Sequence, residues 1–197
     1  MIEKSSYPIL GLLALVSLIS YPFLPVLSLA LLVFAIFTIY FFRDPERKIG
    51  AGIVSPADGK IIYLDKNRMD IFMSPFDCHV NRAPIGGVVK SVRFFKGKKP
   101  PAFIRRGDVC RNEIVIETEL GTFKVTQVAG IFARRIVCYV KEGEKVEKGQ
   151  KIGIIKFGSR VVLEVPDGFK FIRKVGEKIK AGESVAVYEN SKDSGSG

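Results

Sequence analysis

An uninterrupted apolar stretch opens the chain. Between Tyr7 and Phe42 there is no charged residue, and two prolines, Pro22 and Pro25, lie near its middle. Proline lacks a backbone N–H and clashes with the preceding helical turn, so it ends or kinks a helix. The pattern therefore predicts two helical segments with a bend between them.

These segments, Ile9–Tyr21 and Val26–Phe42, predict a helical hairpin. At 1.5 Å per residue the second reaches about 25 Å, close to the thickness of a hydrocarbon core. We therefore expect a transmembrane helical hairpin over residues 1–42 that anchors the chain in the cell membrane. A cleaved signal peptide is the alternative, but a second apolar run follows at once and no small-residue cleavage site separates the two.

Positive residues flank this stretch on both sides: Lys4 before it, and Arg43, Arg47 and Lys48 after it. Positive charge favours the cytoplasmic side of a membrane. We expect both ends of the hairpin, and the domain that follows, on the cytoplasmic side.

After residue 42 the pattern changes to short β-rich runs bounded by glycine and proline. The expected strands are Lys60–Leu64, Asp70–Met73, Gly87–Phe95, Glu113–Thr118, Thr122–Val128, Arg135–Val140 and Val161–Val165. Their spacing is typical of a barrel or sandwich and not of βαβ units. No long helical period occurs in this part. We expect a mainly β, antiparallel domain over residues 43–189, and a flexible polar tail over 190–197.

One segment of this domain repeats. Residues 143–155, which begin Gly-Glu-Lys-Val, are echoed by residues 176–188, which begin Gly-Glu-Lys-Ile. Two copies are too few for a solenoid. Each copy indicates a turn, a strand and a second turn, similar to the hairpins of biotinyl and lipoyl carrier domains.

The chain is basic, with a formal net charge of +11. The apolar segment contributes nothing to this charge, so the β domain carries it. A basic domain beside a bilayer is attracted to anionic headgroups, by about 1 kcal/mol for each nearby Lys or Arg. We expect an anionic membrane surface as a partner. Nucleic acid is not expected, because the sequence has no basic helix, aromatic stacking motif or zinc spacing.

Three cysteines, Cys78, Cys110 and Cys138, show no paired spacing. Neither a disulfide framework nor a CxxC metal site is indicated, so we expect no metal. Cys78 adjoins His79, but neighbours along a strand point to opposite faces. We expect Cys78 to be a small buried side chain and not a nucleophile.

Four motifs follow one another along the β domain. They are Ser55-Pro56-Ala57-Asp58-Gly59, Phe76-Asp77-Cys78-His79-Val80-Asn81-Arg82-Ala83-Pro84, Ala133-Arg134-Arg135 and Phe157-Gly158-Ser159-Arg160. In this order they resemble the phosphatidylserine decarboxylases, in the short single-domain form found in many bacteria and archaea. The resemblance covers about residues 42–188.

The resemblance implies a zymogen that makes a pyruvoyl cofactor from its own backbone. The Ser159 hydroxyl would attack the carbonyl of Gly158, and autocatalytic cleavage would leave a β chain of residues 1–158 and an α chain of residues 159–197. The two chains would form a heterodimer. The pyruvoyl group on residue 159 would form a Schiff base with the amine of phosphatidylserine, and loss of CO₂ would give phosphatidylethanolamine.

Other site residues are implied in the same way. A serine hydroxyl needs a base, which is usually a histidine oriented by a carboxylate. His79 is the only histidine of the chain, so any imidazole role must be its own. The resemblance places Asp58 in the orienting position, with Asp77 as a nearby second carboxylate. Arg134 and Arg135 are expected to contact the headgroup phosphate.

Arg82 departs from the family pattern. Larger members carry a second histidine three residues after the position that His79 matches, and Arg82 stands there. Either His79 serves both self-cleavage and decarboxylation, or Arg82 binds a substrate carboxylate or phosphate, for which its planar fork is well suited. The sequence leaves both open.

Three other functions are alternatives, the first of which is a close variant of the same activity. An archaetidylserine decarboxylase would perform the same chemistry on an ether lipid, and the motifs do not record the lipid tails. A biotinyl-like carrier or adaptor would need a modifiable lysine in a Met-Lys-Met-like turn, which is absent. A membrane-bound serine hydrolase built on Ser159, His79 and Asp58 would lack the Gly-x-Ser-x-Gly elbow.

Overall fold

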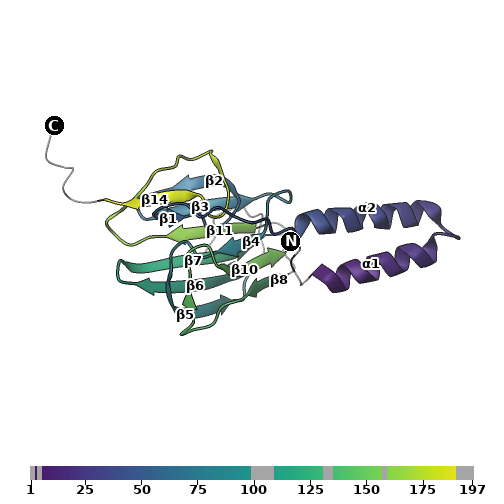
Figure 1. Cartoon of the computed structure of the whole chain (residues 1–197), viewed down its shortest axis with the longest axis horizontal. Coiled ribbons are helices and arrows are strands. Elements are labelled where there is room, and N and C mark those ends of the chain that lie inside the picture. Colours follow the sequence, from purple (N-terminus) through teal and green to yellow (C-terminus); the bar gives the residue numbers. More distant parts are fainter. Residues whose placement is uncertain (1–2, 4–5, 99–108, 131–134, 157–158, 190–197) are drawn as a thin grey trace. The chain divides into compact units, whose positions relative to one another are not determined.

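The computed structural model describes residues 3, 6–98, 109–130, 135–156 and 159–189. The chain separates into two compact units, residues 1–46 and residues 47–197. The first unit holds two helices, and the second holds the strands (Figure 1). The tail predicted over 190–197 lies outside the described residues.

The first unit is a helical hairpin of α1 (Tyr7–Ser20) and α2 (Pro25–Phe41), which lie side by side (Figure 1). Pro25 occupies the first turn of α2, where its missing N–H costs nothing. Ser17 and Ser28 join the helices. Their hydroxyl oxygens are 2.9 Å apart, and each also lies within hydrogen-bond distance of the other residue's backbone carbonyl oxygen, at 3.1 and 2.9 Å. The prolines thus divide the apolar stretch into a hairpin, as predicted.

The transmembrane part of that prediction is not supported. Helix α1 contains 14 residues and α2 contains 17. Within the described ranges, no helix is both long enough and apolar enough to cross a membrane. The physical reason is the bend, because the residues between Ser20 and Pro25 belong to neither helix.

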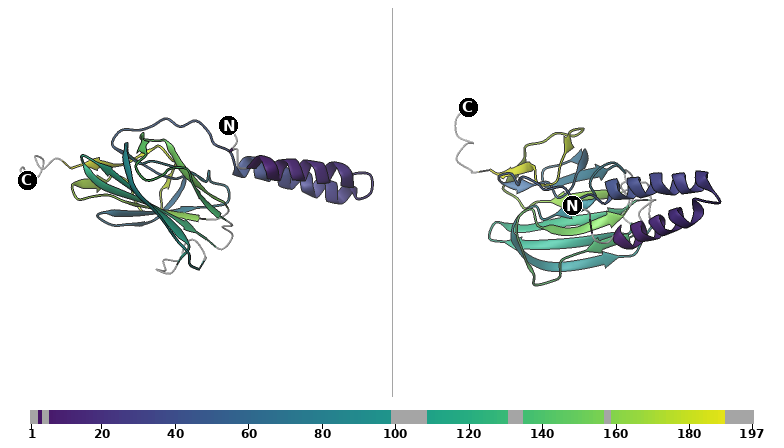
Figure 2. Two further views of the ribbon diagram at one scale, coloured as in Figure 1. Left: turned by 90° about the horizontal axis from the view of Figure 1, so that it is seen from below. Right: turned by 45° about the vertical axis from the view of Figure 1, so that its right-hand side comes forward.

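The second unit is built from antiparallel strands, which confirms the mainly β prediction. The strands are β1 (Ile53–Val54), β2 (Gly59–Leu64), β3 (Arg68–Met73), β4 (Val80–Arg82), β5 (Gly87–Phe95), β6 (Arg111–Thr118), β7 (Gly121–Ala129), β8 (Arg135–Cys138), β9 (Lys145–Val146), β10 (Lys151–Lys156), β11 (Ser159–Glu164), β12 (Phe169–Phe171), β13 (Lys178–Ile179) and β14 (Ser184–Tyr188). Eight of them form the main sheet, in the order β13-β2-β3-β11-β7-β6-β5-β9. Two three-stranded sheets, β1-β14-β12 and β4-β10-β8, complete the unit. Figure 2 shows the twisted strands from two further sides.

All seven predicted strands are present, as β2, β3, β5, β6, β7, β8 and β11, and their ends differ from the prediction by no more than two residues. Outside the repeated segments, the strands β1, β4 and β12 were not predicted; within them, each copy holds two strands where one was predicted. Each of β1, β4 and β12 has only two or three residues, which is too short for an alternating pattern to be recognised.

Alternation along the strands turns one face of the main sheet into the core. In β6, Ile114 and Ile116 are fully buried, while their neighbours Glu113 and Val115 are only half-buried. Leu163 continues the buried face on β11. Burying such a side chain stabilises the fold by about 1.5–3 kcal/mol. The core therefore holds β11 firmly between its neighbours β3 and β7.

The repeated segments adopt the same local structure. In each, a two-residue strand, β9 or β13, is followed by a turn and then by a longer strand, β10 or β14. Both turns contain a glycine with positive φ, Gly149 at 82° and Gly182 at 93°, a conformation that residues with a Cβ rarely adopt. A Cβ on either glycine would meet the side chain of Ile49, so Ile49 lies against both turns.

Candidate active site

Ser159 is the first residue of β11 and is fully buried. It pairs in register with Met73 of β3 on one side and with Ala129 of β7 on the other. Its hydroxyl donates to the thioether sulfur of Met73, with 3.3 Å between Oγ and Sδ. Gly158, on the other side of the predicted cleavage point, lies outside the described residues. The first residue of β11 is thus a buried serine that pairs with two neighbouring strands and whose hydroxyl has only a weak sulfur acceptor.

His79 is also fully buried, and it directly precedes β4. Its Nδ1 lies 2.9 Å from the backbone carbonyl oxygen of Asp77. A carbonyl oxygen can only accept, so Nδ1 carries the hydrogen and the lone pair of the neutral ring is on Nε2. The backbone of His79 is fixed as well, because its carbonyl accepts from the N–H of Ile155 at 3.4 Å. The ring is therefore oriented by a backbone carbonyl and can present Nε2 as a base.

Asp58 directly precedes β2 and is only 7% exposed. Its carboxylate accepts from the guanidinium of Arg47, at 2.9 Å to Oδ1 and 2.7 Å to Oδ2, and Oδ1 also accepts from the backbone N–H of Ala181 at 2.8 Å. Its hydrogen bonds among the described residues therefore go to Arg47 and Ala181, and not to His79. Asp58 links the segment that precedes the first strand to the second copy of the repeat.

Arg47, the ion-pair partner of Asp58, was expected from the sequence only as a positive charge that flanks the apolar stretch. Burial would lower the pKa of its guanidinium, but the charge and hydrogen bonds of Asp58, with a contribution from Cys78, raise the pKa above its ordinary value. Burial raises the pKa of the Cys78 thiol, and this effect outweighs the hydrogen bond with the backbone of Val80, which lowers the pKa. The charge of Asp58 adds to the rise, and Arg47 opposes it. A buried thiol with a raised pKa stays protonated at neutral pH. This supports the prediction that Cys78 is not a nucleophile.

Asp77 and Arg82 support the motif that contains His79. The Oδ2 of Asp77 accepts from the backbone N–H of Ser74 at 2.7 Å and so closes the turn between β3 and His79. Arg82 donates from Nη1 to the carbonyl oxygen of Gly149 at 2.9 Å. Its backbone N–H donates to the carbonyl of Pro56 at 2.9 Å, which brings the first and second motifs side by side. Arg82 thus bonds to the first copy of the repeat.

Arg135 begins β8, where it is exposed and pairs in register with Lys156 of β10. Lys156 lies three residues before Ser159 in the sequence, so the third motif approaches the fourth. Arg134 lies outside the described residues. A backbone hydrogen bond thus joins the first motif to the second, and strand pairing brings Arg135 of the third motif close in sequence to the fourth.

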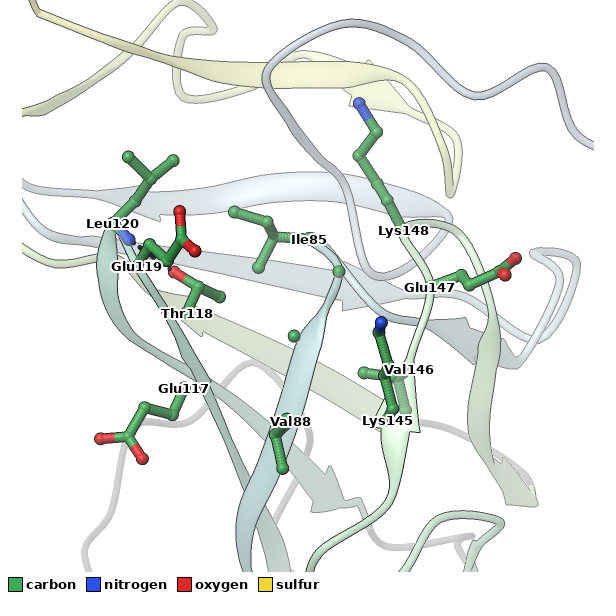
Figure 3. A pocket seen from close by; sticks show the side chains of 12 residues that line it. Ile85, Val88, Glu117, Thr118, Glu119, Leu120, Lys145, Val146, Glu147 and Lys148 are labelled. Atoms are coloured by element: carbon green, nitrogen blue, oxygen red, sulfur yellow. Dashed lines mark hydrogen bonds between the residues drawn. The ribbon is translucent and has the colours of Figure 1, made fainter.

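A cavity of about 720 Å³ lies elsewhere in the β domain (Figure 3). Gly121, which pairs with Thr118 in its wall, lies eight residues along β7 from Ala129, the partner of Ser159. At a rise of about 3.3 Å per residue the two positions are roughly 25 Å apart. The cavity is thus separate from the buried serine. Its lining residues are Ile85–Val88, Glu117–Leu120 and Lys145–Lys148.

Comparison with known proteins shows the family to which the chain is similar. The family model described as phosphatidylserine decarboxylase matches residues 34–187. A protein of Archaeoglobus fulgidus named "Putative archaetidylserine decarboxylase proenzyme" is 63% identical over 191 residues, which cover 97% of this chain and 98% of that protein. A "Phosphatidylserine decarboxylase proenzyme" of Streptomyces coelicolor is 47% identical over 153 residues, 73% of this chain and 69% of the relative. A protein of the same name from Chlorobaculum tepidum is 43% identical over 165 residues, 76% of each chain.

Proposed function

We propose that this chain, which belongs to the phosphatidylserine decarboxylase family, is a proenzyme that cleaves itself before Ser159 and then decarboxylates the serine headgroup of a phospholipid. The observation that carries the proposal is the buried Ser159 hydroxyl, whose hydrogen bond goes to the sulfur of Met73. Sulfur is a weak acceptor, and burying a hydroxyl without a strong partner is costly. A serine with a purely structural role would gain nothing from this placement.

The self-cleavage begins with the Ser159 hydroxyl. His79 Nε2 accepts its proton, Oγ attacks the carbonyl carbon of Gly158, and the Gly158–Ser159 peptide bond is replaced by an ester. Loss of the Ser159 α-proton then breaks the Cβ–Oγ bond, and Oγ leaves as part of the Gly158 carboxylate. Water converts the remaining dehydroalanine to a pyruvoyl group and ammonia. General-base help of this kind contributes about 10²–10⁴-fold.

The residues around Ser159 fit such a group. Both neighbours of β11 hold it over all six of its residues, so the new end of the α chain would keep its position after the cut. Residue 159 is fully buried in the uncut chain, which keeps bulk water from the reacting atoms until the peptide bond is cut. A pyruvoyl group at this position supplies an electron sink for the decarboxylation.

The two products of cleavage share the sheets. The α chain would contribute β11 between β3 and β7, β13 beside β2, and β14 beside β1. All of these partners belong to the β chain. We therefore propose a heterodimer that stays together through strand pairing and a common core.

The lipid tails allow two substrates. Phosphatidylserine, with ester-linked tails, is the first, since relatives from Streptomyces coelicolor and Chlorobaculum tepidum carry its name. Archaetidylserine, with ether-linked tails, is the second, and the relative that is 63% identical over nearly the whole chain favours it. The headgroup reaction is identical for both.

We further propose that the chain works at an anionic lipid surface, with its catalytic domain on the cytoplasmic side of the cell membrane. The hairpin carries no charge between Tyr7 and Phe42, and several of its large apolar side chains are exposed, among them Phe23 at 80% and Val26 at 81%. Such side chains favour the boundary of a bilayer. The net charge of +11 adds attraction to anionic headgroups.

The test is a decarboxylation assay on liposomes. Wild-type protein should release CO₂ from phosphatidylserine, from archaetidylserine or from both, and the ratio of the two rates decides the tail preference. Ser159→Ala should release none. Activity of Ser159→Ala equal to that of the wild type would refute the role of Ser159.

A further inference from the structure

Three buried amide side chains form a hydrogen-bonded row that ends beside Ser159. Asn112 Nδ2 donates to Gln127 Oε1 at 3.0 Å, and Gln127 Nε2 donates to Asn81 Oδ1 at 2.8 Å. Asn81 Nδ2 then lies 3.8 Å from the sulfur of Met73, the atom that accepts from the Ser159 hydroxyl at 3.3 Å. All five side chains are buried, and the most exposed is Asn112 at 2%. We call Asn81, Gln127 and Asn112 the amide row.

The amide row crosses from one sheet to another. Gln127 belongs to β7 of the main sheet, and Asn81 belongs to β4 of the sheet β4-β10-β8. Gly153 of β10, the register partner of Asn81, leaves the room that the crossing needs. A Cβ at Gly153 would lie 2.7 Å from Gln127 Nε2, too close for a real contact. The backbone is thus adapted to the amide of Gln127.

Apolar side chains of similar size at these three buried positions would cost less free energy of desolvation. Buried amides lose their hydration and contribute only when their hydrogen bonds are made in full. In the amide row, each hydrogen bond also has a defined donor and acceptor. Because the carbonyl oxygen of Asn81 accepts from Gln127, its NH₂ group must face Met73.

Two donors therefore meet at one flexible side chain. Methionine has three rotatable bonds and fills irregular gaps, so packing alone fixes its sulfur poorly. The NH₂ of Asn81 and the hydroxyl of Ser159 both approach Sδ of Met73. The first of these donors is fixed by Gln127 and Asn112. The sulfur, and with it the hydroxyl of Ser159, takes its position from the amide row.

We propose that Asn81, Gln127 and Asn112 are positioning residues for the self-cleavage, and that they act through Met73 to fix the place of the Ser159 hydroxyl in the uncut chain. This inference rests on the proposed function. It adds no reacting group, since the proton of Ser159 still passes to His79. It gives the amide row, whose side chains take no part in the reaction steps, a role in positioning Ser159.

The test measures the rate of self-cleavage in freshly synthesised chain. Gln127→Met keeps the size of the side chain and removes both of its hydrogen bonds, and Met73→Leu removes the sulfur at nearly constant volume. Each should slow cleavage by roughly 10- to 100-fold, because small misplacements of reacting groups have effects of this size. Thr126→Val, a polar-to-apolar change beside Gln127 in β7, is the matched control and should cleave at the wild-type rate.

The double variant Met73→Leu/Gln127→Met separates positioning from general loosening of the fold. If the amide row acts through Met73, the double variant cleaves no more slowly than the slower single variant. Independent structural damage would multiply the two effects. Multiplied effects, or a wild-type rate for Gln127→Met, would overturn the proposal.

Circular dichroism and thermal unfolding check that each variant is folded. If Gln127→Met does not fold, Asn112→Leu at the far end of the amide row takes its place in the same comparison, with the same two outcomes. A wild-type chain that is never cleaved would refute the proposed function as well. Normal wild-type cleavage with an unaffected amide-row variant would refute this inference alone.

Discussion

Replacing Arg47 by methionine should destabilise the β domain by leaving Asp58 as an unpaired buried carboxylate. The Arg47 and Asp58 side chains are each only 10% exposed, and two of the three hydrogen bonds of the carboxylate come from Arg47. After the substitution only the N–H of Ala181 remains. Removing one partner of a buried ion pair typically costs about 3–5 kcal/mol. For a domain of this size each kcal/mol lowers Tm by about 2–4 °C, so we expect a fall of roughly 6–20 °C.

The assay is thermal unfolding of the Ser159→Ala background, in which every chain stays uncut. Arg173→Met is the matched control, because Arg173 is more exposed and its ion pairs with Glu177 and Glu183 are both 3.9 Å long. Such surface pairs contribute about 0–1 kcal/mol. If Arg47→Met lowered Tm no more than Arg173→Met, Asp58 would not depend on Arg47. The reasoning about this cluster would then be wrong.

Three further outcomes are expected. His79→Ala should slow self-cleavage by about 10²–10⁴-fold, followed on denaturing gels, because no other imidazole can take the Ser159 proton; cleavage at the wild-type rate would remove His79 from that role. Deletion of residues 1–42 should leave a domain that still cleaves itself, while its turnover on anionic liposomes falls and becomes more sensitive to salt, since screening acts over about 8–10 Å; equal rates and equal salt dependence for both forms would show that the hairpin is dispensable. The two cleaved chains should elute together in gel filtration and separate only in denaturant, because β11 pairs with β chain strands on both sides; separation under native conditions would contradict this.

The sequence predicted the fold wherever a pattern was long enough to carry a signal. The alternating residues of β6 and the apolar run of β11 identified their strands to within two residues. The prolines predicted where the hairpin bends, but they did not predict how many residues would lie outside both helices. The order of strands could not be predicted, since pairing β11 between β3 and β7 depends on contacts far apart in the sequence.

The motifs singled out residues that the fold buries, but they did not show which hydrogen bonds those residues make. The motifs pointed to His79 and Asp58, and both are buried as a reactive site requires. The partner of Asp58 was missed, because Arg47 stands among the basic residues that follow the apolar stretch and looks like a flanking charge. Gln127 is also detectable in the sequence, because it is an amide within the otherwise largely apolar run Val-Thr-Gln-Val-Ala of β7. Such a position indicates a buried polar side chain. Only the structure shows what such an amide contacts.

Intact mass measurement of the purified, active protein under denaturing conditions tests the central claim most directly. The account predicts two polypeptides, residues 1–158 and residues 159–197. The second should be lighter than a serine-headed fragment by the mass of ammonia, and it should react with a carbonyl reagent. Ser159→Ala should give a single chain. An active preparation that contained only the intact, unmodified chain would contradict the account.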